Sequence, residues 1–211
     1  MQITIPIRIA KAMLHLSAKK DSRYYLVGVN FKISPKHLIL QATNGRIAGM
    51  FRHEWDEAPA CEPLDIIVPT HALKSIKLAK VSLTATLAFT PNPGGVATDC
   101  SIECDGVRTS FCPIDGHFPN CSRVMDAADM PNGVVAQYDS ALLERFSAFG
   151  RDMRGAGRSD CAYVNVAHNG NDAAPISIVN VDPDTFCGVI MPFARKGAVP
   201  SIPAWALGDP T

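Results

Sequence analysis

The sequence predicts an α+β protein built from repeated units, each containing one helix and a set of antiparallel strands. Three observations support this class. Residues 81–90 alternate apolar and mostly hydroxyl side chains with a period of two, which is typical of a strand with one buried face. Turn signals separate several such extended runs, and helical patterns are few. The same order of elements then recurs along the chain.

The recurring unit is a short extended stretch, one helix and about three strands. It occurs over residues 2–55, again over 65–113 and again over 134–193. Sequence identity between the three segments is slight, so the repeat lies in the order and spacing of the elements.

The strands follow from local patterns. In the first unit, residues 24–33, 37–43 and 47–53 are expected to be strands, separated by turns at Ser34-Pro35-Lys36 and Asn44-Gly45. In the second unit, the strand over 81–90 is followed by 96–104 and 107–113, and Asp105-Gly106 is a hairpin signal between the last two.

The helices are expected at 7–19, 71–80 and 141–149. Pro6 suits the start of the first, and Thr70 is a plausible N-cap of the second. Asp139 or Ser140 can cap the third, in which Leu142, Leu143 and Phe146 fall on one stripe.

The composition is that of an ordinary globular protein. The chain has 211 residues, 47% of them hydrophobic, and 20 basic residues balance 20 acidic ones, so net charge does not identify a nucleic-acid-binding protein. No apolar run has the length of a membrane span, and the N-terminus does not resemble a signal peptide, so a cytoplasmic location without membrane association is expected. The seven cysteines are an odd number and are expected to be reduced thiols.

No constellation for catalysis or cofactor binding is found. The sequence has no nucleotide-binding glycine motif, and its cysteines and histidines lack the spacing of a metal site. Paired acids such as Asp182 and Asp184 fit turns. We therefore predict a non-catalytic protein with no cofactor and no metal.

Four short segments carry the most specific information. They are Arg23-Tyr24-Tyr25-Leu26-Val27-Gly28, the run from Gln41 to Ala48, Asp115-Gly116-His117-Phe118-Pro119 with Arg123-Val124, and Val189-Ile190-Met191-Pro192-Phe193. Together, in this order, they resemble the bacterial DNA polymerase III β subunit, the sliding clamp, in a truncated form. In that family, domains made of two such units close into a ring around duplex DNA, with helices lining the hole.

The resemblance implies a domain organisation of about one and a half clamp domains. Residues 1–125 resemble the complete middle domain of the family, and 126–133 would be a linker. Residues 134–194 resemble the second half of the last domain, and 195–211 would be a tail.

The resemblance also implies a groove that accepts a short peptide from polymerases and other replication proteins. Carried over by position, its residues would be Leu26, Thr43, Gly45, Arg46, Ile47, Pro119, Arg123, Val124, Val189, Met191, Pro192 and Phe193. Two departures from the family pattern suggest a different peptide preference. The loop Asn44-Gly45-Arg46 is one residue shorter than usual, and Phe193-Ala194 replaces the usual Met-Arg. Taken singly, the apolar members of this set are more typical of strand core.

Basic residues recur along one face of the predicted helices. The proposed DNA-facing residues are Arg8, Lys11, Lys19, Lys74, Lys77, Arg151 and Arg154. Phosphate contacts from such residues are independent of base sequence, as sliding requires. A solvated basic face is the plainer interpretation.

The sequence therefore predicts a processivity factor that encircles duplex DNA and tethers DNA polymerase, with a clamp loader as a further partner. With three half-domain units per chain, a homotetramer is the simplest ring. The alternative is a clamp-derived regulatory protein that binds clamp-binding peptides without encircling DNA. An enzyme on the same scaffold is a third option that no residue cluster supports.

Overall fold

The structure, a computed structural model, describes residues 1–79, 81–92, 96–123, 137–154, 164–168, 177–182 and 184–193. The predicted linker and tail, together with Val124, lie outside these residues. The elements, in chain order, are β1 (Gln2–Ile5), α1 (Ile7–Ala12), the short 3-10 turns η1 (Met13–His15) and η2 (Tyr24–Leu26), β2 (Gly28–Ile33), β3 (His37–Thr43), β4 (Ile47–Glu54), β5 (Leu64–Pro69), α2 (Thr70–Ser75), β6 (Ala85–Asn92), β7 (Val96–Cys104), β8 (Val107–Phe111), α4 (Ser140–Arg154), β9 (Asn165–His168), β10 (Ser177–Asp182) and β11 (Phe186–Ile190).

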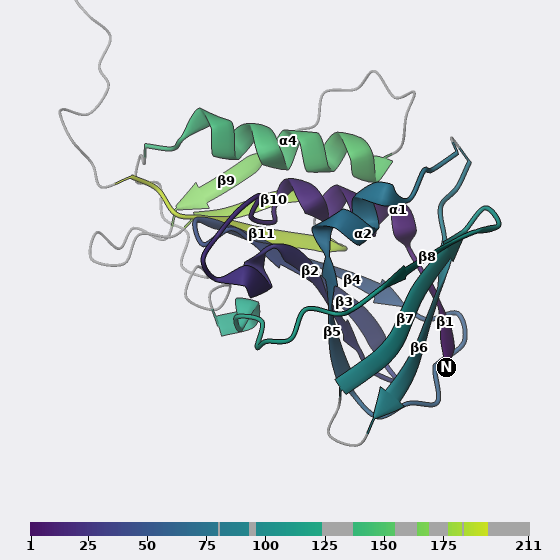
Figure 1. The fold of residues 1–211 in the computed structure, drawn as a ribbon. Helices are drawn as coiled ribbons and strands as arrows, with labels where there is room; N and C mark the ends of the chain where they lie inside the picture. The colour runs from purple at the N-terminus through teal and green to yellow at the C-terminus, as the bar shows by residue number, and fades with distance from the viewer. Residues whose placement is uncertain are drawn as a thin grey trace, which may run out of the picture.

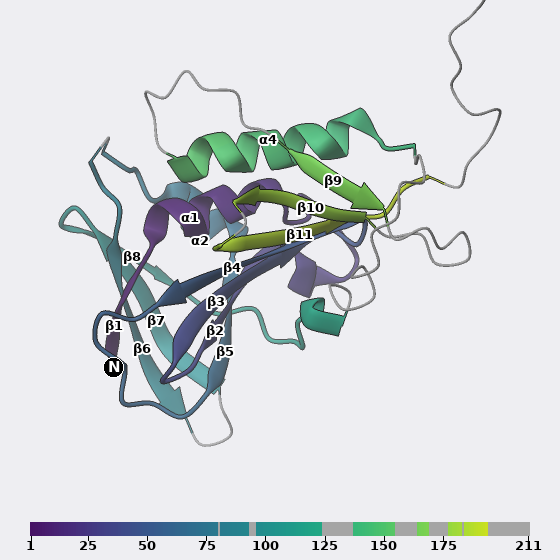
Figure 2. The same cartoon turned by 180° about the vertical axis from the view of Figure 1, so that it is seen from behind.

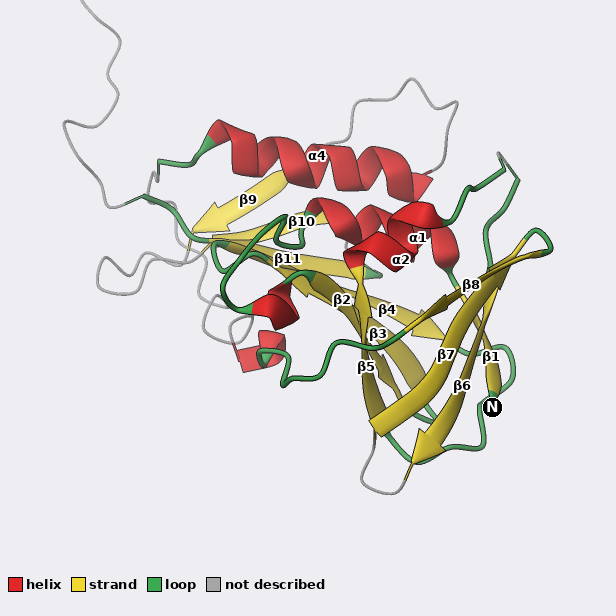
Figure 3. Cartoon of the chain, in the orientation of Figure 1, coloured by secondary structure: helices red, strands yellow, loops and turns green. Residues whose placement is uncertain are grey.

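The strands form two antiparallel sheets, and the helices gather on one side of the molecule (Figures 1 and 3). A four-stranded sheet has the order β1-β6-β7-β8, and a seven-stranded sheet has the order β5-β2-β3-β4-β11-β10-β9. The first strand of each of the first two units therefore pairs within the other unit's sheet. This exchange binds units one and two into one body, whose main core includes the fully buried Phe31, Leu40 and Leu87.

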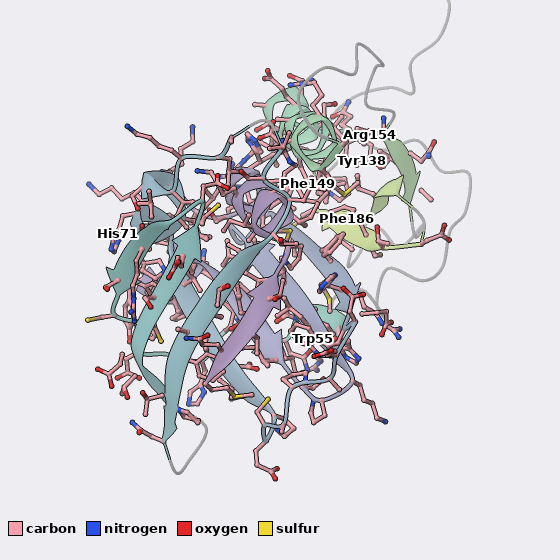
Figure 4. The ribbon with its side chains drawn as sticks, turned by 90° about the vertical axis from the view of Figure 1, so that its right-hand side faces the viewer. Trp55, His71, Tyr138, Phe149, Arg154 and Phe186 are labelled. Atoms are coloured by element: carbon pink, nitrogen blue, oxygen red, sulfur yellow. The ribbon has the colours of Figure 1, made fainter. Side chains whose placement is uncertain are left out.

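The third unit joins the first edge to edge. Strand β11 pairs antiparallel with β4, from Phe186 opposite Phe51 to Ile190 opposite Ile47 (Figure 2). Helix α4 packs beside α1 above this joint, and both helices are seen nearly end on in Figure 4. Their apolar side chains share the main core, so one hydrophobic core spans units one and three.

Aromatic packing secures α4 over the joint. Phe146 and Phe149 are fully buried, and the Phe149 ring lies 4.3 Å from the Phe186 ring between their centroids (Figure 4). Two hydrogen-bonded contacts add to it: Arg145 Nη2 donates to the Ser17 carbonyl at 2.5 Å, and His15 Nε2 lies 2.6 Å from Asp152 Oδ2. Burial of three phenyl rings dominates, since each contributes about 1.5–3 kcal/mol and an exposed polar contact contributes about 1 kcal/mol or less.

A pair of glycines makes room for these rings. Gly49 and Gly188 lie opposite each other at the β4–β11 joint. A Cβ on Gly188 would come within 2.7 Å of Phe146 Cε1, and one on Gly49 within 2.4 Å of Leu16 Cδ1. Only glycine lets the helices lie this close to the strands.

We therefore expect Gly188→Ala to lower the free energy of unfolding by about 1–2 kcal/mol, because the added methyl overpacks the joint. Urea denaturation measures this loss. Phe146→Leu removes the clashing ring edge, so the double variant should lose less than the sum of the two single losses. Strictly additive losses would contradict this packing.

Most predicted strands are confirmed, and the ends of several elements differ. Strands 37–43 and 96–104 match β3 and β7, and the Asp105-Gly106 hairpin is present with φ of 51° and 75°. The strand predicted at 81–90 begins only at Ala85. Ser82 Oγ hydrogen-bonds Asp105 Oδ2 and accepts from the Ala79 N–H, which holds a turn there and leaves Val81 and Leu83 exposed.

The predicted helix lengths were wrong. The first helix was predicted to reach residue 19, but α1 ends at Ala12 and η1 at His15, because the Ala18 N–H donates to the Leu26 carbonyl instead of continuing the helix. Helix α2 ends at Ser75, and Pro69 rather than Thr70 occupies its N-cap.

Helix α4 extends to Arg154, beyond the predicted end, and its start is capped as predicted, with Asp139 Oδ1 accepting from the Ala141 N–H at 2.9 Å. The predicted strand 24–33 begins with the turn η2, and β2 starts at Gly28.

Candidate binding groove and basic helix face

A small apolar cavity lies at the β4–β11 joint, where segments far apart in the sequence meet. Its volume is about 210 Å³. The 23–26 turn, the loop between β3 and β4, the segment after β8 and the end of β11 all contribute to it. The lining residues are Arg23, Leu26, Thr43, Gly45, Arg46, Ile47, Ala48, Pro119, Cys121, Val189 and Met191.

The loop between β3 and β4 is fixed by its own side chains. Asn44 Oδ1 accepts from the N–H groups of Arg46 and Ile47 at 2.9 and 3.0 Å. Thr43 Oγ1 donates to the Ile47 carbonyl at 2.7 Å, while Gly45 takes a φ of +84° that favours glycine. The end of β11 is joined to this loop, because the Met191 N–H donates to the Arg46 carbonyl at 2.9 Å. The loop therefore holds one wall of the cavity in a defined shape.

Arg23 lies over this loop at the rim of the cavity. A Cβ on Gly45 would come within 2.6 Å of Arg23 Nη2, so the glycine allows the guanidinium to approach. Asp21 holds the guanidinium in place, accepting from Arg23 Nε and Nη2 at 3.0 and 2.9 Å. These hydrogen bonds lower the pKa of Asp21 to about 2 from its ordinary 3.8. Since the pKa is depressed in the folded state, the pair persists at neutral pH and fades only as the pH falls below about 4 toward 2.

The floor of the cavity is apolar and buried. Ala48, Cys121 and Val189 form a small buried cluster apart from the main core, with Met50 and Phe118 packed against it. Leu26 and Ile47 are each 1% exposed, whereas Met191 at the mouth is 55% exposed. Such a shape, with a buried apolar floor and an adaptable thioether at the entrance, suits an apolar side chain of a ligand.

Burial raises the pKa of the Cys121 thiol to about 11. At pH 8 only about one such thiol in a thousand is therefore a thiolate, and its side chain is also inaccessible. We expect Cys121 to react with iodoacetamide at pH 8 at least about tenfold more slowly than the exposed Cys112, as measured by mass spectrometry of digested protein. Equal rates at the two thiols would contradict the closed floor.

The structure brings eight of the twelve predicted groove residues around this cavity: Leu26, Thr43, Gly45, Arg46, Ile47, Pro119, Val189 and Met191. Of the others, Pro192 is buried, while Arg123 and Phe193 are exposed and do not line it. Sequence reasoning missed Arg23, Ala48 and Cys121 as lining residues. Arg23 and Ala48 both lie inside segments quoted for the resemblance, so the sequence contained a signal for these two.

The predicted basic face is only partly available to a ligand. Lys19, Lys74, Lys77 and Arg151 are exposed. Arg8 Nη2 donates to the Ser82 carbonyl at 3.2 Å, and Lys11 Nζ donates to the Ile76 carbonyl. Partial burial lowers the pKa of Lys11. These two side chains therefore connect α1 to the segment after α2, and Arg154 is half-buried.

A second, larger hollow of about 1340 Å³ lies along β5, β7 and β8 and the segment after β8. Asp65, His71, Asp99 and His117 are among its lining residues. Within the described part of the chain, no group of three or more His, Cys, Asp or Glu side chains is placed to hold a metal ion. None of the helices described has the length and apolarity to span a bilayer.

The architecture is that of the DNA clamps, and the predicted clamp fold is confirmed by solved structures. The sequence itself matches no family model and no curated protein. Several solved structures are similar to this chain. They include a candidate DNA polymerase III beta subunit from Eubacterium rectale (TM-score 0.60, 11% identity, covering 92% of this chain and 65% of that one) and a DNA polymerase sliding clamp from Pseudomonas aeruginosa solved with a ligand (0.57, 16%, 92% and 66%).

A sliding clamp from Bacillus subtilis is similar to the same extent, with a TM-score of 0.57 and 13% identity, covering 93% of this chain and 65% of that one. The chain thus spans about 65% of the length of these neighbours. At these identities, the likeness establishes the fold.

Proposed function

We propose that the protein is a sliding-clamp-like processivity factor, a non-catalytic protein that encircles duplex DNA and tethers DNA polymerase through a peptide-binding groove. The observation that carries the proposal is the cavity at the β4–β11 joint. Segments around Leu26, Ile47, Pro119 and Met191 were selected from the sequence for their resemblance to the clamp groove, and they line one apolar cavity within a clamp fold.

The groove is suited to a short extended peptide with apolar anchor residues. Its floor buries apolar side chains, and the guanidinium groups of Arg23 and Arg46 at the exposed rim favour acidic residues beside the anchors. The Asp21 carboxylate offsets part of the Arg23 charge. Arg46 is therefore the stronger candidate for an ionic contact.

Encirclement is the second part of the proposal. We take residues 1–125 as a complete domain, 126–133 as a linker and 134–194 as half a domain. The edge-to-edge joint then orders the units along an arc: unit two, unit one, unit three. Pairing of third units from two chains would complete a domain, and four chains would supply the twelve units of a clamp ring. The exposed Lys19, Lys74, Lys77 and Arg151 would then contact phosphates regardless of base sequence, and a clamp loader would open the ring.

Light scattering at micromolar concentration tests this assembly. The expected mass is four times the 22.7 kDa of the chain. A monodisperse monomer would rule out the ring.

The alternative function is a regulator that occupies clamp-binding peptides without encircling DNA. The observation that favours it is the diluted basic face, since Arg8 and Lys11 hydrogen-bond to backbone carbonyls and His15 faces Asp152. Such a protein would bind peptides normally and show no salt-dependent affinity for duplex DNA. A fluorescence anisotropy titration with a labelled duplex separates the two functions.

A further inference from the structure

Strand β8 is the outer strand of the four-stranded sheet, and no further strand lies beside it in the described part of the chain. We propose that this edge pairs with β8 of a second copy of the same chain, antiparallel and across a two-fold axis. The inference deepens the proposed ring and rests on it for its biological role, whereas the contact itself requires neither DNA nor the groove.

The chain contains its own precedent for this contact. Strands β4, β8 and β11 are the last strands of the three units. β4 and β11 pair antiparallel with each other over five consecutive residue pairs, with aromatic and branched apolar pairs at the two ends. Strand β8 has the same position in unit two as β4 in unit one and β11 in unit three, and one of its two edges is paired with β7. Pairing of last strand with last strand is therefore the way in which this fold already joins units one and three.

The edge lacks two of the features that commonly protect exposed strands. Its sequence, Val107-Arg108-Thr109-Ser110-Phe111, contains no lysine and no proline, which commonly protect edge strands. Val107 exposes 66% of its surface at this edge. Strand β5 differs, because its edge already receives a hydrogen bond from the Ile114 N–H to the Ile67 carbonyl.

The charge on β8 also allows β8 of a second copy to pair with it. Arg108, the one charged residue of β8, hydrogen-bonds back over β7, where its Nε donates to Ser101 Oγ at 3.0 Å, and it stands opposite Glu103 in the β7–β8 register. Its side chain therefore reaches back over its own sheet and not across the edge.

A symmetric register follows from the length of the strand. With Thr109 on the two-fold axis, Val107 of one chain lies opposite Phe111 of the other, and Arg108 lies opposite Ser110. Each pair is compatible, and no charge stands directly opposite a like charge. Because five residues make a short interface, this contact is expected to hold best where other contacts close the assembly.

The consequence is a defined symmetry. One two-fold contact between third units and another between β8 strands alternate around a closed ring, so four chains close with dihedral rather than head-to-tail symmetry. Heterologous head-to-tail contacts are then not needed.

The test combines edge variants with a cross-link. Val107→Lys together with Thr109→Lys places lysines on the edge, so the solution mass should fall from four chains to two while peptide affinity stays unchanged. In a Cys112→Ser background, Thr109→Cys should form a disulfide-linked dimer on mild oxidation. Lys36→Cys in the same background, exposed at the β2–β3 turn, serves as the matched control.

Unchanged mass in the lysine variant, with no more cross-linking at position 109 than at position 36, would overturn the inference. Cross-linking at position 109 without retention on DNA would support the β8 contact and count against the proposed function. Retention on DNA without cross-linking at position 109 would support the proposed function and count against the β8 contact.

Discussion

Changing Lys74 and Lys77 together to glutamate should weaken binding to duplex DNA by about a hundredfold at low salt, the largest effect expected of any pair of substitutions here. Each side chain is exposed at or just after α2, on the side of the molecule where the helices gather (Figure 3). In the proposed ring, the reversal would remove two phosphate contacts per chain and add repulsion, and four chains would multiply the loss. The measurement is a titration of labelled duplex at several salt concentrations, in which the dependence of affinity on salt should also become shallower.

The matched control is Lys32→Glu with Lys36→Glu. These lysines are exposed on β2 and the turn after it, neither of which belongs to a helix, and the double change alters net charge by the same amount. Equal losses in the two double variants would mean that DNA responds only to net charge. Lys74 lies in the last turn of α2, so circular dichroism should accompany the titration to exclude helix loss.

The second large effect is expected at the groove. Met191→Glu should weaken binding of an apolar peptide by about thirtyfold, or about 2 kcal/mol, because a carboxylate at the mouth of an apolar cavity must be desolvated when the peptide binds. Met191 is 55% exposed, so the fold should tolerate the change. A fluorescein-labelled pentapeptide ending in Leu-Phe is the probe, and the same peptide ending in Ser-Ser measures nonspecific binding.

Val81→Glu is the control for this prediction, since Val81 is 84% exposed and does not line the cavity. It introduces the same charge in place of an apolar residue. If both variants bind the Leu-Phe peptide as tightly as the unchanged protein does, the cavity is not the peptide site.

The comparison of sequence and structure separates local from nonlocal information. Hairpins such as Asp105-Gly106 and the alternating strands were predictable because turn chemistry and period-two burial act between neighbours. Helix ends were not, because a tertiary hydrogen bond from the Ala18 N–H to the Leu26 carbonyl ends the first helix. The exposure of Val81 was likewise hidden, since it depends on a bond from Ser82 to Asp105.

The candidate groove also combines features that were predictable from the sequence with features that depend on tertiary packing. Its apolar members could be proposed from the sequence, because the four segments that contain them occur in the same order as in the clamp family. The contribution of Cys121 could not, since its burial depends on packing against Ala48 and Val189 from two strands. Tethering of Arg8 and Lys11 to backbone carbonyls was equally invisible, because a helical stripe does not reveal which side chains a neighbouring loop will engage.

The most direct test of the clamp proposal is retention on DNA of different topology. The labelled protein, assembled on a nicked circular plasmid with or without a clamp loader, is passed through a sizing column in salt high enough to suppress simple phosphate binding. Encirclement predicts that the protein stays with the circle and is lost once a restriction enzyme linearises it. Equal loss from the circular and the linear DNA, under conditions in which the tetramer persists and a loader is present, would contradict it.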